Sequence, residues 1–362
     1  MDTVMILANN DIGLYNFRKE LIEELLKQQY KVVILLPRGE RVRDLEAMGC
    51  VFVETELSRH GMNPIQERKL MKFYKQIIKM YKPDLICSYT IKPNIYGGLA
   101  AAQCKVPYIA NITGLGTAIE SGGIVGKMLI SLYKRALKNA ECVFFQNKSN
   151  MEFMEEKGIR AKQIKMLPGS GVNLHQHAYE VYPDHGNKIQ FLFVGRLMRD
   201  KGVIELIEAA RFMYEKYPNV RFCLVGGCEK EFQTVLDQID LPECVELCGQ
   251  QKDVHSYMKQ ADAIVLPSYH EGMANVLLEA AACGRPVLAS NVPGCRETFD
   301  EGRSGYGFQA KDVRSLVQAL EKFISLSQSE REEMGLAGRK KMEKEFDRKI
   351  IIHEYMKLIQ KI

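Results

Sequence analysis

The chain contains 362 residues, 46% of them hydrophobic and 26% charged, which is ordinary for a globular protein with two domains. No apolar run approaches the roughly 20 residues that a membrane-spanning helix needs, so we expect no transmembrane segment. A strand-like apolar stretch begins at Val4, and we therefore expect no cleavable signal peptide. The ten cysteines form no Cys-x-x-Cys pair and no His/Cys cluster with zinc spacing, which favours reduced, buried thiols in the cytoplasm.

Positive charge is concentrated in the first half of the chain, although the whole chain carries only +5. Residues 1–168 hold 25 Lys and Arg against 17 Asp and Glu, whereas the remaining residues hold 25 against 28. This asymmetry indicates that the first half contacts something anionic.

Short apolar runs alternate with amphipathic segments along residues 1–168. The runs that we expect to be strands cover residues 4–8, 31–37, 84–89 and 107–112. Residues 16–29 and 64–81 have the apolar period of helices. This alternation predicts a parallel sheet with helices on both faces, and we take residues 1–168 as a first domain.

Residues 169–187 interrupt this rhythm, because Pro, Gly, Asn and His dominate there, and we predict a linker. Strand-like runs then resume at residues 189–195, 221–227, 245–249, 263–268 and 286–290. We predict a second α/β domain over residues 188–345, and a C-terminal helix over residues 346–362 that packs back toward the first domain. The expected fold is thus two doubly wound, Rossmann-like domains that face a cleft, with ligands at the carboxyl ends of the strands.

The stretch FVGRLMRDKG places two cations at a strand end and a helix start. Gly195 and Arg196 follow the expected strand, and Lys201 precedes the expected helix. A guanidinium fork and a lysine point charge at such a junction suit a diphosphate. A solvated loop with incidental cations is the alternative interpretation.

The stretch HEGMANVLLEAAACG carries two acids eight residues apart, Glu271 and Glu279. A helix is expected to begin near Ala274 or Asn275, directly after a buried strand. Its first backbone N–H groups would form an anion site, contributed by Met273, Ala274, Asn275 and Val276. We interpret the amides as phosphate donors and the two acids as acceptors for sugar hydroxyls. Alternatively, Glu271 only complements the helix dipole and Glu279 is a surface acid.

Together and in this order, the two motifs resemble the Glu-x7-Glu signature and the diphosphate motif of the retaining glycosyltransferases of family 4, which have the GT-B fold. The resemblance covers essentially the whole chain. It implies that Arg196 and Lys201 hold the donor diphosphate and that Glu271 lies at the transferred sugar. It also implies that Glu279 binds the ribose and that the amides after Gly272 contact sugar and phosphate.

The same resemblance places the nucleobase beside Gln251, in the stretch CGQQKDV. It implies no metal and no cofactor, because cationic side chains neutralise the diphosphate in this fold. In the first domain, Gly13 corresponds to the glycine loop of the family, which approaches the donor phosphates. Thr113 and Gly114, in NITGLGTA, are expected on the acceptor side, and Thr113 stands where many family members have a histidine.

Finer similarity, in ELSRHGMNP, FFQNKSNMEFMEEKG and GSGVNL, indicates the N-acetylgalactosaminyltransferase-like subgroup that extends undecaprenyl-diphosphate-linked sugars. Basic and apolar residues interleave at 68–82 and 127–138, which predicts peripheral contact with an anionic membrane surface. The residues expected to face the membrane are Lys72, Lys75, Lys79, Lys134 and Arg135. Ordinary surface helices with one face on the sheet are the alternative.

The sequence therefore predicts a retaining transferase that moves a sugar from a UDP-sugar to a polyprenyl-diphosphate-linked saccharide. N-Acetylgalactosamine, or another hexosamine or hexose, is the expected donor sugar, used in bacterial N-glycan, capsule or O-antigen assembly. We expect a cytoplasmic location, peripheral on the inner face of the plasma membrane, and no nucleic-acid partner. Two alternatives stay open, namely another GT-B reaction such as nucleotide-sugar epimerisation and a non-catalytic sugar- or nucleotide-binding module.

Overall fold

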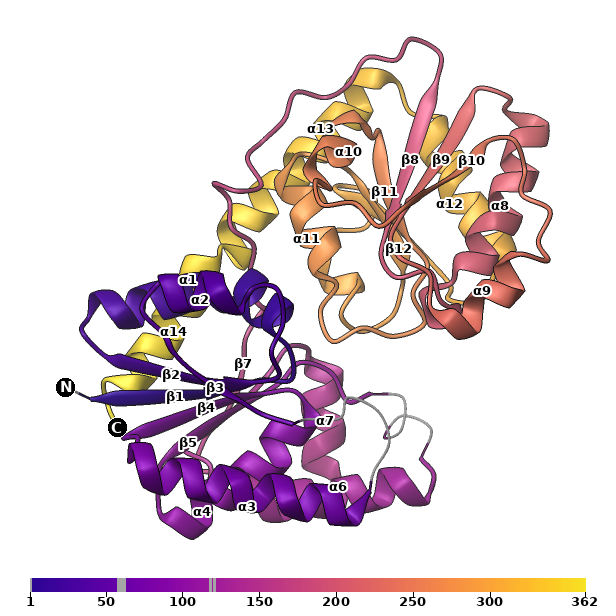
Figure 1. Cartoon of the computed structure of the whole chain (residues 1–362). Coiled ribbons are helices and arrows are strands. Elements are labelled where there is room, and N and C mark those ends of the chain that lie inside the picture. Colours follow the sequence, from indigo (N-terminus) through magenta and orange to yellow (C-terminus); the bar gives the residue numbers. More distant parts are fainter. Residues whose placement is uncertain (1, 57–62, 117–118, 120–121) are drawn as a thin grey trace. The chain divides into compact units, whose positions relative to one another are not determined.

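The computed structural model describes residues 2–56, 63–116, 119 and 122–362, which divide into two compact units (Figure 1). Unit 1 comprises Met1–Ser170 together with Lys349–Ile362, and unit 2 comprises Gly171–Arg348. Within the part of the chain that the structure describes, no helix combines the length and the apolar character that crossing a membrane requires.

Unit 1 is built on a seven-stranded parallel sheet with the order β3-β2-β1-β4-β5-β6-β7. Its strands are β1 (Thr3–Leu7), β2 (Lys31–Leu36), β3 (Val51–Glu54), β4 (Leu85–Tyr89), β5 (Tyr108–Ile112), β6 (Cys142–Phe145) and β7 (Ile164–Met166). Strands β1, β4, β5 and β6 are buried at every residue. Such uninterrupted burial is expected of parallel strands that are covered on both faces.

The helices of unit 1 form two layers. One face of the sheet packs against α3 (Pro64–Tyr81), η1 (Pro93–Gly97), α4 (Gly98–Cys104), α6 (Ile124–Leu137) and α7 (Lys148–Glu156). The other face packs against α1 (Asp11–Lys27), α2 (Val42–Ala47) and the C-terminal helix α14 (Arg348–Ile359). Tyr355 of α14 lies with its ring centroid 4.8 Å from that of Phe144, and its hydroxyl accepts a hydrogen bond from Asn111 at 2.8 Å. The C-terminal helix is therefore part of the core of unit 1.

Unit 2 contains a six-stranded parallel sheet with the order β10-β9-β8-β11-β12-β13. Its strands are β8 (Ile189–Val194), β9 (Val220–Val225), β10 (Val245–Gly249), β11 (Ala263–Leu266), β12 (Val287–Ser290) and β13 (Gly305–Phe308). Its helical segments are η2 (Arg199–Lys201), α8 (Val203–Lys216), α9 (Lys230–Leu236), α10 (His255–Gln260), α11 (Asn275–Ala282), η3 (Arg296–Thr298), α12 (Val313–Ile324), α13 (Gln328–Lys341) and η4 (Met342–Phe346).

Both sheets reverse their strand order at their first strand, so that β1 lies between β2 and β4, and β8 lies between β9 and β11. The prediction of two doubly wound, Rossmann-like domains is confirmed. In such sheets the ligand crevice lies outside the carboxyl ends of the strands at the reversal. The loops after β1, β4, β8 and β11 are therefore expected to carry the ligand-binding residues.

Two local expectations differ from the structure. Helix α1 begins at Asp11, so Gly13 is a helical residue and not part of a loop; Asn10 caps the helix by accepting the Gly13 N–H at 2.5 Å. The segment 169–187 does not behave as a free linker, because most of it packs on unit 2. Arg285 donates to the carbonyl oxygens of Glu180 and Val181, at 3.1 and 2.9 Å.

Candidate active site

The carboxyl ends of β8 and β11 bring the two predicted motifs of unit 2 together. Gly195 and Arg196 follow β8, and residues 267–271 follow β11. Gly202 ends the η2 turn with a φ of 68°, and a Cβ placed there would lie 2.1 Å from the carbonyl oxygen of Pro267. Only glycine tolerates both this backbone conformation and this approach. Gly202 therefore allows the turn that carries Lys201 to lie directly against the loop after β11.

Lys201 and Glu271 form an ion pair across this junction. The Lys201 ammonium contacts Oε1 of Glu271, and the Ser268 hydroxyl donates to the same oxygen at 2.8 Å. The two paired side chains are only 22% and 14% exposed. Partial removal from water strengthens such interactions and holds both charges in place.

Arg196 forms a second ion pair, with Glu229 at the start of α9. The Arg196 side chain is 64% exposed and that of Glu229 is 35% exposed. An exposed pair of this kind contributes little to stability, so an anionic ligand can take over the guanidinium at small cost. Lys201 is thus a cation held within the candidate site, and Arg196 is an exposed cation at its edge.

Helix α11 begins at Asn275, in agreement with the sequence prediction, and no side chain caps it. The Ala274 N–H donates to the carbonyl oxygen of Gly294 at 2.8 Å, so this amide is not available to the predicted anion site. The N–H groups of the first helical turn, at Asn275 and Val276, have no partner within an α-helix. Oδ1 of Asn275 is buried without a hydrogen-bond partner at the same place. A ligand that offers both phosphate oxygens and hydroxyl groups would satisfy these amides and this acceptor.

Glu279 lies one helical turn further along α11 and is half-buried. Burial raises the pKa of its carboxyl to about 7, while the positive charge of Arg348 acts in the opposite direction. Glu279 therefore changes its protonation state near neutral pH, unlike an ordinary surface glutamate.

Further residues of unit 2, some of them predicted, line the same sheet edge. Gln251 follows β10, and its side-chain amide donates to the carbonyl oxygen of Cys248 at 2.5 Å. Gly226, which follows β9, has a φ of 152°, and a Cβ there would lie 1.8 Å from the Gly195 carbonyl oxygen. Gly272 and Met273 belong to the loop between β11 and α11, where Met273 is buried. The loops after β8, β9, β10 and β11 thus form one continuous rim.

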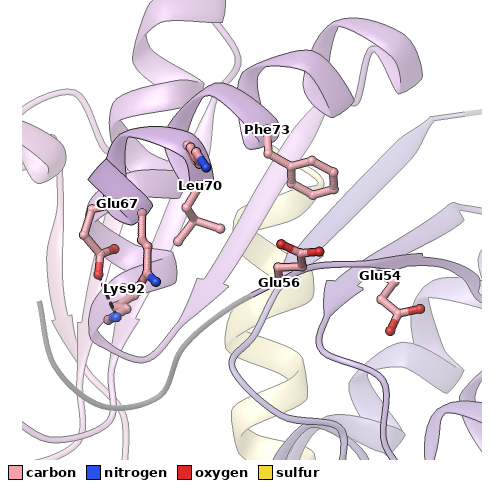
Figure 2. Close-up of a pocket in the computed structure, with 8 residues that line it drawn as sticks. Glu54, Glu56, Glu67, Leu70, Phe73 and Lys92 are labelled. Carbon is pink, nitrogen blue, oxygen red and sulfur yellow. Dashed lines mark ion pairs between the residues drawn. The ribbon is translucent and has the colours of Figure 1, made fainter. Parts of the chain in front are cut away.

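In unit 1, a cavity of about 800 Å³ opens between the end of β3 and the first turns of α3 (Figure 2). It is lined by Glu54, Glu56, Gln66, Glu67, Lys69, Leu70, Phe73 and Lys92. Lys92 follows β4, and its ammonium lies 2.7 Å from the carboxylate of Glu67. Acids, an ammonium group and a phenyl ring around one space suit a hydroxylated ligand that has one apolar face.

The remaining predicted residues of unit 1 do not join this cavity. Thr113 and Gly114 follow β5 and are half-buried, and Gly13 lies in α1. Residues 57–62 of the stretch ELSRHGMNP and residues 117–118 of NITGLGTA lie outside the described residues.

The basic residues that were expected to face a membrane lie on α3 and α6. Lys72, Lys79, Lys134 and Arg135 are exposed, and the half-buried Lys75 donates to Gln103 at 3.3 Å. The first turns of the same helices also expose apolar side chains, with Ile65 69% and Ile124 88% exposed. Both helices thus combine an exposed basic flank with an exposed apolar start.

Several residues that shape the sites were missed by sequence reasoning. In unit 2 these are Ser268, Glu229, Gly202, Gly226 and Gly294. In unit 1 they are the residues of the cavity, above all Glu67 and Lys92. The glycines after apolar strands were the one available signal, because a glycine at a strand end often marks close backbone approach.

Comparison with known proteins places both units in one enzyme group. The family model described as glycosyl transferases group 1 matches residues 180–341, and the model described as glycosyl transferase 4-like matches residues 4–147. The capsular polysaccharide biosynthesis glycosyltransferase CapM of Staphylococcus aureus is 33% identical, over 92% of this chain and 90% of that protein.

A second relative is the N,N'-diacetylbacillosaminyl-diphospho-undecaprenol α-1,3-N-acetylgalactosaminyltransferase of Campylobacter jejuni. It is 29% identical, over 98% of this chain and 98% of that protein. Among solved structures, Anabaena HepE in complex with UDP and glucose superimposes with a TM-score of 0.82 at 17% identity, covering both chains completely. At this low sequence identity, the similarity to HepE shows the fold alone.

Proposed function

The chain belongs to the group 1 glycosyltransferases, with a glycosyltransferase 4-like first domain, and we propose that it moves a sugar from a UDP-sugar to a polyprenyl-diphosphate-linked saccharide. N-Acetylgalactosamine is the first donor sugar to test, because the Campylobacter relative is named for its transfer to an undecaprenol-diphosphate-linked sugar. Bacterial glycan or capsule assembly is the corresponding role.

One observation carries the proposal of catalysis: the Lys201–Glu271 pair lies where the loops after β8 and β11 meet. A cation there can face the leaving diphosphate, and the carboxylate beside it can accept hydroxyls of the transferred sugar. A module that only bound sugars would release no UDP, so turnover distinguishes it from a transferase. An epimerase would use the same nucleotide contacts but would require no second saccharide, and this difference can be tested.

The proposed reaction breaks the bond between the anomeric carbon of the donor sugar and the diphosphate oxygen of UDP. A hydroxyl oxygen of the acceptor forms the new bond on the same face, and its proton passes to the leaving diphosphate. No nucleophile of the enzyme takes part. Arg196, Lys201 and the first turn of α11 stabilise the negative charge that develops on UDP. Glu271 holds the transferred sugar, and Glu279 accepts hydrogen bonds from the ribose.

We assign the cavity of unit 1 to the acceptor saccharide. The carboxylates of Glu54 and Glu56 can accept sugar hydroxyls, and the ring of Phe73 offers an apolar surface to a sugar face (Figure 2). Lys69 and Lys92 provide positive charge for an anionic group of the acceptor. This assignment is supported by Lys92, which lines the cavity and follows β4, one of the two strands beside the reversal of strand order at which ligands of such sheets bind.

The proposal has two further parts: catalysis without a metal ion, and peripheral attachment to a membrane. Catalysis proceeds without a metal ion, because Arg196 and Lys201 supply the positive charge at the diphosphate. The chain attaches peripherally to an anionic membrane surface through α3 and α6, where a lipid-linked acceptor resides. The inner face of the bacterial plasma membrane is the location that fits such an acceptor.

The decisive experiment offers a panel of UDP-sugars to the purified chain, with and without a synthetic polyprenyl-diphosphate monosaccharide. We expect UDP release and a disaccharide product only when both substrates are present. Activity should persist after treatment with EDTA. Conversion of a UDP-sugar to its epimer without acceptor would indicate an epimerase instead of a transferase. Tight UDP binding without turnover would indicate a binding module. Activity that disappears with EDTA and returns with magnesium would refute metal-independent catalysis.

A further inference from the structure

A cluster of metal-ligating side chains lies in unit 2, outside the motifs described above. His177, His255 and Cys283 each offer one ligand atom, and these three atoms all lie within 4.8 Å of one another. They come from the segment before β8, the first residue of α10 and the residue that ends α11. We propose that the three side chains bind one thiophilic divalent cation, with zinc as the best match, and that Glu180 orients the His255 ring.

The spacing of two of the ligands already fits a tetrahedral ion. Sγ of Cys283 lies 3.6 Å from Nδ1 of His255. Zinc binds sulfur at about 2.3 Å and nitrogen at about 2.0–2.1 Å, which separates a sulfur and a nitrogen ligand by about 3.6 Å in a tetrahedron. A thiol–imidazole hydrogen bond produces the same distance, and metal binding distinguishes the two.

The orientation of His255 supports the metal site. Its Nδ1 faces the thiol, while its Nε2 lies 2.9 Å from Oε1 of Glu180. A histidine that binds a metal usually donates its other N–H to a carboxylate, which fixes the ring and makes the ligand more basic. The other carboxylate oxygen of Glu180 lies 3.2 Å from the Lys259 ammonium, and this contact helps to hold the carboxylate beside the His255 ring.

The three proposed ligands differ in how far they are buried. Cys283 is fully buried, whereas His177 and His255 are half-buried, so an ion can enter from the histidine side. Cysteine binds metal ions as the thiolate, so a bound ion would displace the proton of the Cys283 thiol. The buried guanidinium of Arg285 favours the thiolate but also repels a cation. Its N–H groups are occupied by the carbonyl oxygens of Met258, Lys259, Glu180 and Val181.

The three ligands join parts of unit 2 that are distant in sequence. His177 belongs to the segment of unit 2 that precedes β8, and His255 begins α10 directly after the loop of Gln251. Cys283 ends α11, whose first turn contributes to the candidate active site about 12 Å away along the helix. The ion would therefore join the segment before β8 to the C-terminal end of α11, and would stabilise unit 2 without contacting the substrates.

The test uses the full chain, freed of metal by a chelator that is then dialysed away. Zinc is titrated in competition with a chromophoric chelator, and cobalt(II) is added in a parallel experiment. We expect zinc to bind and to raise the melting temperature of the chain. Cobalt should produce the thiolate-to-metal charge-transfer absorption that a cysteine ligand causes. Wild-type chain that takes up no zinc would overturn the proposal and leave a thiol–imidazole hydrogen bond.

Variants locate the ion. Cys283→Ala and His255→Gln should each weaken zinc binding by about 100-fold or more, and Glu180→Gln should weaken it by about 10–100-fold. Cys283→Ser repeats the test with a side chain of similar size, in case the alanine variant does not fold. The matched control is Cys248→Ala, which lies in a separate group with Cys223 and Glu246. Unchanged zinc affinity and cobalt spectrum in Cys283→Ala, or their loss in Cys248→Ala alone, would overturn the assignment.

Discussion

Units 1 and 2 reverse their strand order in the same way but form their ligand-binding edges differently. In unit 2, a Cβ at Gly202, Gly226 or Gly294 would lie 2.1, 1.8 or 2.7 Å from a backbone oxygen of a neighbouring loop. The loops after β8, β11 and β12 therefore pack closely beside Lys201 and Glu271, and the loop after β9 packs against Gly195. In unit 1, an open cavity of about 800 Å³ lies beside the outermost strand β3, and Lys92, which follows β4, lines it.

This difference indicates a division of tasks. Charges that stabilise a transition state act best when they are fixed before the ligand arrives, and close backbone packing provides this in unit 2. A saccharide acceptor offers many hydroxyls and is held by contacts that tolerate variation, which suits an open cavity. Variants can now separate the two edges, because damage to unit 2 should affect turnover and damage to unit 1 should affect the use of acceptor.

The largest effect is expected at the cations of unit 2. Arg196→Ala and Lys201→Ala should each lower turnover by about 100-fold or more, because loss of one electrostatic stabiliser at a developing charge costs about 3–4 kcal/mol. Steady-state kinetics with saturating donor and acceptor measures this effect. The matched control is Arg199→Ala, an exposed arginine of the same η2 turn. If both variants turn over at nearly the wild-type rate, the diphosphate lies elsewhere.

The next effect is expected at the cavity of unit 1. Phe73→Ala and Glu56→Gln should raise the KM for acceptor by about tenfold, which corresponds to about 1.4 kcal/mol of lost binding. The affinity for UDP should remain unchanged, since the proposed UDP site lies in unit 2. Gln76→Ala, a change on the same helix that does not line the cavity, serves as the control. An unaltered acceptor KM in both cavity variants would remove the cavity from the proposed function.

A pH-dependent effect is expected at Glu279. Its pKa is raised to about 7 in the unliganded chain, and its ionised form accepts ribose hydroxyls best. UDP affinity should therefore fall as the pH decreases from about 8 to about 6, by up to about tenfold. The terminal phosphate of UDP also titrates near pH 6, so the comparison is with Glu279→Gln, which lacks the carboxyl. This variant should bind UDP more weakly at about pH 8 and lose part of the pH dependence.

The same raised pKa has a consequence for stability. The folded chain binds the Glu279 proton more tightly than the unfolded chain does, so this contribution to stability is present below about pH 4. It is lost as the pH rises toward about 7.

The prediction on UDP affinity has its own contradicting outcome. Identical pH profiles of UDP binding in wild type and Glu279→Gln would show that Glu279 does not contact the nucleotide.

The fold could be predicted from the sequence, because fully buried parallel strands appear as uninterrupted apolar runs. The start of α11 at Asn275 was predictable for the same reason, since an apolar strand and a small-residue helix flank one short turn. The strands β3, β6, β7 and β13 were not anticipated: β3, β7 and β13 are only partly buried and do not form uninterrupted apolar runs, and the buried run of β6 was overlooked. Gly13 was misplaced because Asn10 caps α1 earlier than the apolar pattern begins.

The chemistry of the site was less accessible from sequence, because it depends on contacts between distant residues. The hydrogen bond from Ala274 to Gly294 removes an amide that the local pattern offered to an anion. The cluster of His177, His255 and Cys283 could not be recognised from spacing, since folding alone brings these residues together. The cavity of unit 1 likewise requires β3, α3 and Lys92 to meet.

The smallest effect per residue is expected at the basic helices of unit 1. Each lysine near an anionic surface contributes about 1 kcal/mol, and several must act together to hold the chain on a membrane. The chain should sediment with anionic liposomes at low salt and be released at roughly 0.5 M salt, where the Debye length is well below about 8 Å. The exposed apolar side chains of Ile65 and Ile124 would add an attraction that salt does not weaken.

Charge reversal distinguishes the electrostatic part of this attachment from the apolar part. Replacing Lys72, Lys75 and Lys79 of α3 by glutamate should weaken sedimentation while leaving UDP affinity unchanged, because the proposed UDP site lies in unit 2. The matched control reverses three exposed lysines of unit 2: Lys230, Lys252 and Lys344. Equal loss of sedimentation in both triple variants would mean that net charge, not α3, governs the attachment. If wild type binds neutral and anionic liposomes equally, the basic flanks of α3 and α6 are ordinary solvated surfaces, and apolar contacts through Ile65 and Ile124 are the remaining route to a lipid-linked acceptor.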